Sequence, residues 1–198
     1  GTLDPLATGL LIICTGKMTK QIDSFQAQIK EYTGTLVLGS TTPSFDLETE
    51  INERFSTEHI TEDLIHNTTK QFTGEIQQFP PIFSAIKKDG KRLYEFARTG
   101  ETVEIKSRTV TISEFEITKI DTSTKSILSE VERLSTGSIH IDFKVVCSKG
   151  TYIRSLVNDF GKALNSGAHL SALRRTKIGN FNVADAASIE TFIRSLKN

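Results

Sequence analysis

Residues 138–164 read SIHIDFKVVCSKGTYIRSLVNDFGKAL, and this stretch joins the two periodicities that decide the fold class. From Ser138 to Lys144, apolar and polar side chains alternate, which predicts a strand with one buried face. Beyond Gly150, apolar residues recur at helical spacing, which predicts a helix over residues 151–165 with Thr151 as its candidate N-cap. The chain is therefore expected to pass from a strand through a glycine turn into a helix.

The segments outward from this stretch follow the same two patterns. Further strands are predicted over residues 30–38, over 102–120 in two pieces and over 169–182, with an extended segment over 74–87. Helices are predicted over residues 17–30, 61–72 and 92–98, and in a terminal segment that carries Ile189, Phe192, Ile193 and Leu196. Strands dominate the middle of the chain without regular strand–helix–strand alternation. The sequence therefore predicts an α+β fold, with a large mixed or antiparallel sheet flanked by helices.

The composition is that of an ordinary globular protein, because 37% of the 198 residues are hydrophobic and 24% are charged. No apolar run approaches the roughly 20 residues of a membrane span, and no signal peptide is recognisable. Cys14 and Cys147 lie in apolar stretches without metal-ligand spacing, which favours buried, reduced thiols in a cytoplasmic protein. No internal repeat or low-complexity tract divides the chain, so residues 1–198 are predicted to form a single domain.

The formal net charge of zero argues mildly against a nucleic-acid partner, but the charges are unevenly distributed. An acidic segment over residues 44–64, predicted to be an exposed loop, balances two basic segments over residues 87–98 and 148–177. If the basic segments share a face, they provide a surface for a polyanion; the alternative is that each is an ordinary solvated face.

The first twelve residues, GTLDPLATGLLI, place one acid between turn residues and a short apolar run. Pro5 fixes its own φ and disfavours the helical conformation at Asp4, while Gly1 and Gly9 allow turns on either side. A carboxylate on such a stiff loop is a candidate nucleophile or base. The alternative is a simple Asp-Pro turn.

Three other segments carry candidate chemistry. Lys30-Glu31-Tyr32 places an aromatic residue at the start of a strand. Arg154 falls in the first turn of its predicted helix, where the macrodipole disfavours a cation, so a local reason such as an acidic partner is needed. Leu173-Arg174-Arg175 suits either phosphate contacts or an ordinary exposed strand. Glycine-rich phosphate loops and nucleophile elbows are absent from the sequence, so no nucleotide cofactor and no metal are expected.

Together these segments resemble the TruB-type pseudouridine synthases, which make the pseudouridine of the tRNA T-loop. The segments that carry the resemblance are, in chain order, Gly1 to Gly9, Lys30 to Tyr32, Gln78 to Lys87 with Gly90 and Tyr94 to Arg98, Cys147 to Arg154, and Gly167 to Arg175. So many motifs in the family's order favour a catalytic Asp4 over the simple turn. Relative to the family pattern, we expect an N-terminally incomplete catalytic domain without a C-terminal PUA domain.

The resemblance implies that the T-loop uridine at position 55 of tRNA is isomerised to pseudouridine without a cofactor. Asp4 would act at the ribose C1′ or C2′ of a flipped-out nucleotide, paired with Arg154, while Tyr32 would stack on the base. The implied substrate-binding residues are Tyr152 and Leu173 as pocket walls and Lys87, Lys149, Arg174 and Arg175 as RNA-backbone contacts. A monomeric cytoplasmic isomerase that binds the tRNA T-arm and no membrane is expected. The alternative is a non-catalytic RNA-binding or tRNA-folding protein with the same fold.

Overall fold

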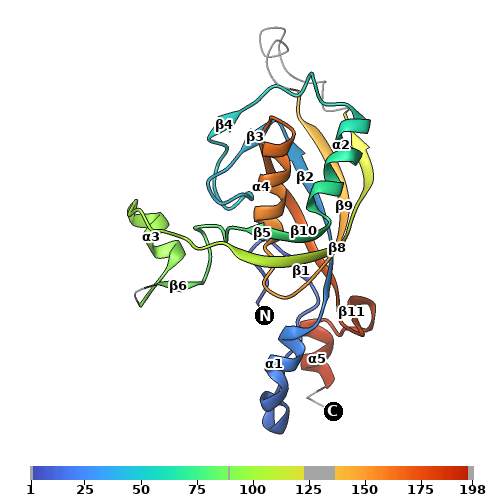
Figure 1. The fold of residues 1–198 in the computed structure, drawn as a ribbon. Helices are drawn as coiled ribbons and strands as arrows, with labels where there is room; N and C mark the ends of the chain where they lie inside the picture. The colour runs from blue at the N-terminus through green and yellow to red at the C-terminus, as the bar shows by residue number, and fades with distance from the viewer. Residues whose placement is uncertain (1, 89, 123–136, 196–198) are drawn as a thin grey trace.

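The computed structural model describes residues 2–88, 90–122 and 137–195 (Figure 1). Gly1 of the opening motif, Asp89 of the first basic segment and Leu196 of the predicted terminal helix lie outside the described residues. Within the described part, a mixed sheet is flanked by helices, so the predicted α+β class is confirmed. No helix in these residues is both long enough and apolar enough to cross a membrane.

The main sheet has seven strands in the described residues, in the order β1-β10-β2-β9-β8-β5, with β11 paired to β10. Their bounds are β1 Thr8–Gly9, β2 Lys30–Leu38, β5 Gly74–Gln78, β8 Arg108–Asp121, β9 Ile139–Cys147, β10 Ala168–Ile178 and β11 Phe181–Asn182. Only the β1 and β10 pairing is parallel among these strands, and all other neighbours are antiparallel. The sheet is therefore mixed by virtue of the short strand that follows the opening loop.

The core lies between one face of the sheet and helix α4 (Ile153–Ala163), which contacts β10 (Figure 1). Along β9, every second residue from Ile139 to Cys147 is buried, as the alternation predicts. Phe160 of α4 is fully buried and meets Phe72 and Phe115 edge to face, at centroid distances of 5.9 and 5.3 Å. Truncating such a ring to alanine typically costs about 3–5 kcal/mol, so this contact anchors α4 on the sheet.

The start of α4 differs from the prediction. Its N-cap is Tyr152, not Thr151, and the Tyr152 side chain makes no capping bond. The Thr151 hydroxyl instead donates to the Ser148 carbonyl within the preceding turn, at 3.0 Å. The buried Gln78 side chain binds the backbone of Tyr152 instead. Its Oε1 accepts from the Tyr152 amide at 2.8 Å, and its Nε2 donates to the Tyr152 carbonyl at 3.0 Å. A residue from the edge strand β5 thus fixes the backbone where the helix begins.

Strand β10 contains a bulge at its midpoint. Its register against β2 shifts between Leu170 and Ala172, and the Ser171 hydroxyl there donates to the Thr35 carbonyl at 3.0 Å. As a result Leu170 and Leu173, three positions apart, both reach the core. A regular strand would turn these two side chains to opposite faces.

Several other predicted elements are confirmed. The strand predicted over residues 30–38 is β2. The N-cap of α2 (Glu62–Thr69) is Thr61, as predicted, and its side chain accepts from the Leu64 amide at 3.2 Å. β5 ends before the proline pair and lies at the sheet edge, as predicted. The remaining elements are β3 Ser40–Thr41, β4 Glu53–Arg54, β6 Lys87–Lys88, β7 Lys91–Arg92, α3 Leu93–Thr99 and α5 Ile189–Ser195, and short 3₁₀ turns Lys70–Phe72 and Val183–Asp185.

Three predictions are corrected. The helix predicted over residues 17–30 is a 3₁₀ turn, Gly16–Gln21, followed by a six-residue helix, α1 (Ile22–Ala27), and none of these residues is buried. Of the two pieces predicted over residues 102–120, only the second is a strand, β8. The acidic segment 44–64 is not an exposed loop throughout, because Ser44 and Asp46 are buried. Each error comes from a tertiary contact, or from the lack of one, that local periodicity does not encode.

Candidate functional site

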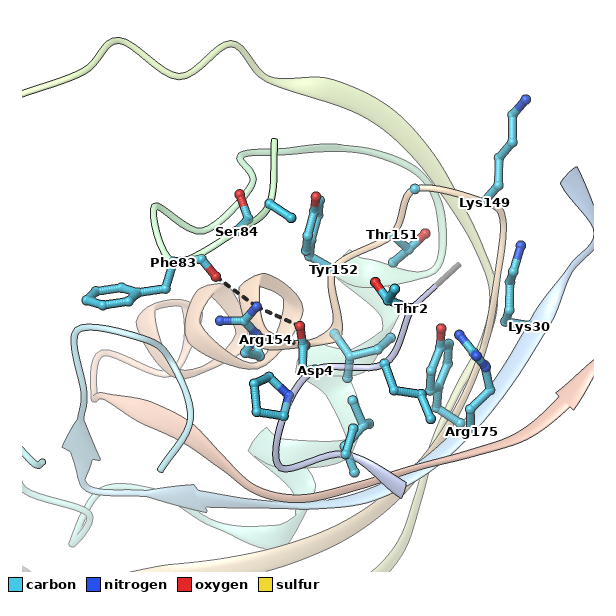
Figure 2. A pocket seen from close by; sticks show the side chains of 18 of the residues that line it. Thr2, Asp4, Lys30, Phe83, Ser84, Lys149, Thr151, Tyr152, Arg154 and Arg175 are labelled. Carbon is cyan, nitrogen blue, oxygen red and sulfur yellow. Dashed lines mark hydrogen bonds and ion pairs between the residues drawn. The ribbon is translucent and has the colours of Figure 1, made fainter. Parts of the chain in front are cut away.

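One large cavity, with a volume of about 990 Å³, opens where the opening loop meets β2, β10 and the turn before α4 (Figure 2). Seven of the nine predicted site residues line it, namely Asp4, Tyr32, Lys149, Tyr152, Arg154, Leu173 and Arg175. Lys87 on β6 and Arg174 on β10 do not line it. The structure thus brings together residues from segments far apart in the sequence.

Asp4 and Arg154 form a two-pronged ion pair inside this cavity (Figure 2). Arg154 Nε donates to Asp4 Oδ2 and Arg154 Nη2 donates to Asp4 Oδ1, each at 2.9 Å. The Arg154 side chain is 3% exposed, while that of Asp4 is 36% exposed and faces the cavity. This is the acidic partner that the position of Arg154 at a helix start predicted. The Asp-Pro turn also exists, since the Ala7 amide donates to the Asp4 carbonyl at 2.9 Å.

A second carboxylate, that of Asp46, lies close to the same guanidinium. Its Oδ2 is 3.5 Å from Arg154 Nε, and its side chain is 6% exposed. Two carbonyl oxygens accept further Arg154 hydrogen bonds: Nη1 donates to Ser44 at 3.1 Å and Nη2 to Phe83 at 3.0 Å. We call Asp4, Asp46 and Arg154 the buried cluster. Asp46 and Arg154 are both buried, and removing one partner of such a buried pair typically costs about 3–5 kcal/mol.

The segment that carries Asp46 is tied to β10. Phe45 has a positive φ of 64°, its carbonyl accepts from the Leu170 amide at 2.9 Å, and Asp46 forms an isolated bridge with Leu170. The Thr42 hydroxyl donates to the Asp46 carbonyl at 2.6 Å. Sequence reasoning missed Asp46 because it stands among many acids, and only this tertiary contact sets it apart from them.

Arg175 fixes both the opening loop and Tyr32. It is 2% exposed, and its Nε donates to the Leu10 carbonyl at 2.8 Å while its own carbonyl accepts from the Leu10 amide at 2.8 Å. Burial raises the pKa of the Tyr32 phenol, and a hydrogen bond from Arg175 opposes that rise. The guanidinium therefore lies within the pocket wall, and its contact with an RNA phosphate stays a prediction.

Gly9 allows the backbone of the opening loop to approach the backbone of β10 closely. Its φ is +105°, and a Cβ at this position would lie 2.2 Å from the Arg175 carbonyl oxygen. Any side chain there would separate β1 from β10 and release the loop that carries Asp4. The glycine of the opening motif is thus required by the close approach of two backbones.

Lys30 is a buried cation in the same cavity. Its Nζ donates to the carbonyls of Gln26 and Gln28, the second at 2.6 Å, and its exposed fraction is 8%. Burial lowers the pKa of Lys30, the neighbouring Cys147 thiol opposes this effect, and Arg175 adds to it. Burial also raises the pKa of the Cys147 thiol to about 11. Cys147 is buried as predicted, whereas Cys14 is only partly buried.

The comparison with known families bears on this site. Residues 1–153 match the TruB family pseudouridylate synthase (N terminal domain), and residues 154–197 match the tRNA pseudouridylate synthase B C-terminal domain. The chain belongs to the TruB family. The boundary between the two matches falls at Arg154, so the buried cluster draws Asp4 and Asp46 from the first region and Arg154 from the second.

Relatives and solved structures agree with this assignment. The chain is 64% identical over 197 residues to the tRNA pseudouridine synthase B of Flavobacterium johnsoniae, covering 100% of this chain and 79% of that protein. It is 52% identical to that of Phocaeicola vulgatus, covering 97% of this chain and 75% of the relative. A chain in the crystal structure of a Cbf5-Nop10-Gar1 complex superimposes with a TM-score of 0.60 at 29% identity, covering 92% of this chain. This chain spans only 40% of that solved chain.

For this TruB-family chain, the predicted site residues make up only part of the cavity wall. The residues that line it without having been predicted include Asp23, Gln26, Lys30, Glu48, Ser84, Arg98 and Arg108. Asp23 and Gln26 come from α1, whose position beside the cavity is not visible in local periodicity. Among the described residues, no group of three or more His, Cys, Asp or Glu side chains is placed to hold a metal ion.

The two predicted site residues outside the cavity are exposed cations. Lys87 lies on the two-residue strand β6, and Arg174 donates from Nη1 to the Thr8 hydroxyl at a long 3.4 Å. Arg174 alternates with Leu173 and Arg175 along β10, so its side chain faces away from the cavity. Their contacts with an RNA backbone stay predictions.

Proposed function

We propose that this chain isomerises a uridine of tRNA to pseudouridine, and that its substrate is the T-loop uridine at position 55. The observation that carries the proposal is the two-pronged Asp4–Arg154 ion pair in a large cavity of a TruB-family chain. The names of the relatives, tRNA pseudouridine synthase B, support the reaction and the class of substrate. The T-arm as the recognised element, the monomeric state and the cytoplasmic location are parts of the same proposal.

The reaction is an isomerisation, so its atoms balance without a co-reactant. The N1–C1′ glycosidic bond breaks, the uracil rotates, and a C5–C1′ bond forms. The proton that leaves C5 is balanced by the proton gained at N1. No net oxidation or group transfer takes place, which agrees with the absence of nucleotide-binding motifs from the sequence.

Asp4 is the group proposed to act at the ribose. An ionised carboxylate can add to C1′ or remove the C2′ proton, and both routes need it to remain charged in a site that excludes water. Arg154 donates two charge-assisted hydrogen bonds to this carboxylate. The partial exposure of Asp4, at 36%, leaves its carboxylate accessible from the cavity while Arg154 holds it from behind.

The target base must leave its stack to reach Asp4. A base that stays stacked within a folded loop cannot enter the cavity in which this carboxylate lies. Tyr32 and Leu173 line the same cavity as Asp4 and provide the aromatic and apolar surfaces that a flipped base requires. Tyr32 is proposed to stack on the base, with its ring held by Arg175. Tyr152 lines the cavity near the start of α4.

The test compares the full chain with its Asp4→Asn variant on a T-arm stem-loop RNA. Because isomerisation leaves the mass unchanged, pseudouridine is read after chemical derivatisation. We expect turnover to fall by about 10²–10⁴-fold, the contribution typical of a group that acts in acid–base catalysis. Binding should change by less than about threefold, because the carboxylate is not a phosphate contact.

Asp185→Asn, which changes an exposed acid far from the cavity, is the matched control and should behave as the parent chain does. Undiminished turnover in Asp4→Asn would remove Asp4 from the mechanism. A parent chain that binds the RNA but forms no pseudouridine would favour the alternative, an RNA-binding or tRNA-folding protein.

A further inference from the structure

Arg108 is a cavity residue that the family motifs quoted above do not include. It begins β8 and pairs with Gln78 of the edge strand β5. Its guanidinium carbon lies 5.2 Å from the centre of the Tyr152 ring, a distance at which cation and ring attract each other. Arg108 and Tyr152 both line the cavity, and both are partly exposed. Their shared surface is therefore accessible from the cavity.

The support beneath Arg108 is rigid. The Gln78 side chain, 1% exposed, binds the Tyr152 backbone through both its amide oxygen and its amide nitrogen. Gly150 adjoins the guanidinium on another side, since a Cβ added at this residue would lie 3.5 Å from Arg108 Nη1. Gly150 has a φ of +82°, which favours glycine and keeps this space free. Arg108 thus lies over the side chain of a residue whose backbone is held at both its N–H and its carbonyl, beside an open backbone turn.

The charge of Arg108 is not neutralised by the protein. Elsewhere on the sheet, cations have acids: Lys144 contacts Glu114 at 2.6 Å, and Lys177 contacts Glu31 at 3.2 Å. Across residues 2–88, 90–122 and 137–195, Arg108 forms no ion pair and its side chain donates no hydrogen bond. Its guanidinium N–H groups therefore stay available to a ligand.

The neighbouring cavity residues strengthen the positive field. Lys149, at the tip of the turn that contains Gly150, is exposed and lines the cavity (Figure 2). Arg98 also lines it and lies 5.3 Å from the centre of the Tyr94 ring, which makes a second arginine–tyrosine pair. We call Arg98, Arg108 and Lys149 the basic rim. An anion at this rim meets cations that are exposed or partly exposed and unpaired with acids, in contrast to the buried cluster.

We propose that Arg108, stacked on Tyr152, binds a phosphodiester group of the RNA strand adjacent to the nucleotide in the cavity. This inference rests on the proposed function, because it takes RNA as the substrate. Arg108 lies over the Tyr152 ring and has no acidic partner among the described residues, and the paired N–H groups of a guanidinium match two phosphate oxygens. Such a contact positions the strand without reading its sequence. Lys149 adds a second, non-directional charge beside it.

The test measures equilibrium binding of a T-arm stem-loop over a salt series, with Asp4→Asn as the parent so that no product forms. Arg108→Gln removes the charge and retains a polar chain. We expect Kd at low salt to rise about 5- to 20-fold, and the slope of log K against log salt to become shallower by about 0.7–0.9, the loss of one phosphate contact. Arg54→Gln, at an exposed arginine outside the cavity, is the matched control and should leave the slope unchanged.

Arg108→Lys separates charge from geometry. It should keep the parent's salt slope but bind more weakly by about 2- to 5-fold, because lysine lacks the planar fork. If Arg108 only supported Tyr152, both substitutions would lower kcat when made in the chain that retains Asp4. The salt slope measured with the Asp4→Asn parent would stay unchanged. This result would overturn the proposal. If Arg108→Gln does not fold, as judged by its circular dichroism, an Arg108→Lys variant that binds as tightly as the parent overturns it too. Binding and salt slope are measured without turnover, so a chain that makes no pseudouridine leaves this test decisive.

Discussion

The buried cluster and the basic rim use the same kinds of charged side chain in opposite ways. In the cluster, Arg154 is 3% exposed and each of its guanidinium nitrogens has a protein acceptor. At the rim, Arg108 and Lys149 are exposed or partly exposed and no acid within the described residues is paired with them. Charges that satisfy one another hold a geometry, whereas charges left unsatisfied are available to a polyanion. The cavity therefore has a fixed group of paired charges in one part of its wall and cations without acidic partners in another.

The largest effect is expected when the hydrogen-bond geometry of the buried cluster is changed while its charge is kept. Arg154→Lys retains one cation but cannot donate to Asp4 in two places and also reach the Phe83 carbonyl. We expect kcat/KM to fall by about 10²–10³-fold, the range seen when a fixed donor is lost from an active site. Binding to the stem-loop should change by less than about threefold, since Arg154 is not part of the rim. Arg54→Lys, at an exposed arginine outside the cavity, is the control, and turnover equal to that of the parent in Arg154→Lys would contradict the assigned geometry.

A smaller effect is expected when the second carboxylate is neutralised. Asp46→Asn keeps the shape and the bond from the Glu48 amide to Oδ1, at 3.0 Å, but removes one of the two anions that hold Arg154. The two bonds to Asp4 persist, so we expect kcat to fall by about tenfold with KM changed by less than twofold. Asp63→Asn, on exposed α2, should change neither. A variant with normal kcat and only a lowered Tm would make Asp46 a purely structural residue.

The smallest effect concerns the buried thiol of Cys147, which belongs neither to the buried cluster nor to the basic rim. Burial raises the pKa of Cys147 from 9.0 to about 11, so between these values the unfolded thiol loses its proton before the folded one does. Stability should accordingly decline as pH rises from about 9 to 11, by at most about 3 kcal/mol. The raised pKa of Tyr32 acts in the same direction, and the lowered pKa of Lys30 opposes both.

Urea unfolding at several pH values checks this prediction. Cys147→Ala should be less stable than the parent near pH 8 but should lose less stability on the way to pH 10.5. Cys14→Ala, at the partly buried thiol, should retain the parent's decline. Equal declines in Cys147→Ala and the parent would show that this thiol does not contribute to the pH dependence.

The sequence alone predicted the elements whose burial is periodic. β2 and β9 were found because strand alternation or β-rich composition marks them, and α4 because its apolar face recurs over three turns. The short α1 was predicted too long, since its apolar stripe never packs against the core. Weak periodicity over residues 102–107 predicted a strand, but the structure has no strand there.

For the site, local chemistry reached Arg154 and Asp4 but not their surroundings. An arginine at a helix start needs an anion, and the family resemblance pointed to Asp4 as that anion. Asp46 and Arg108 escaped notice, and Gln78 was noted only as the start of a motif, because what distinguishes each one is a partner distant in the sequence. Contacts of this kind are created by the sheet order and are absent from any single segment.

The bulge at Ser171 has a consequence for how much the chain length of β10 can vary. It resets the phase of the strand, so that Leu173 and Arg175 present the same face as Leu170 despite the odd spacing. Deleting Ser171 would leave Leu170, Ala172 and Leu173 opposite three consecutive residues of β2, so the regular alternation that results would keep Leu173 and Arg175 on their face. Inserting one residue after Ala172 would instead turn Leu173 and Arg175 to solvent and bring Arg174 to the cavity. β10 can therefore lose a residue at its bulge but cannot gain one beyond it without exchanging its two faces.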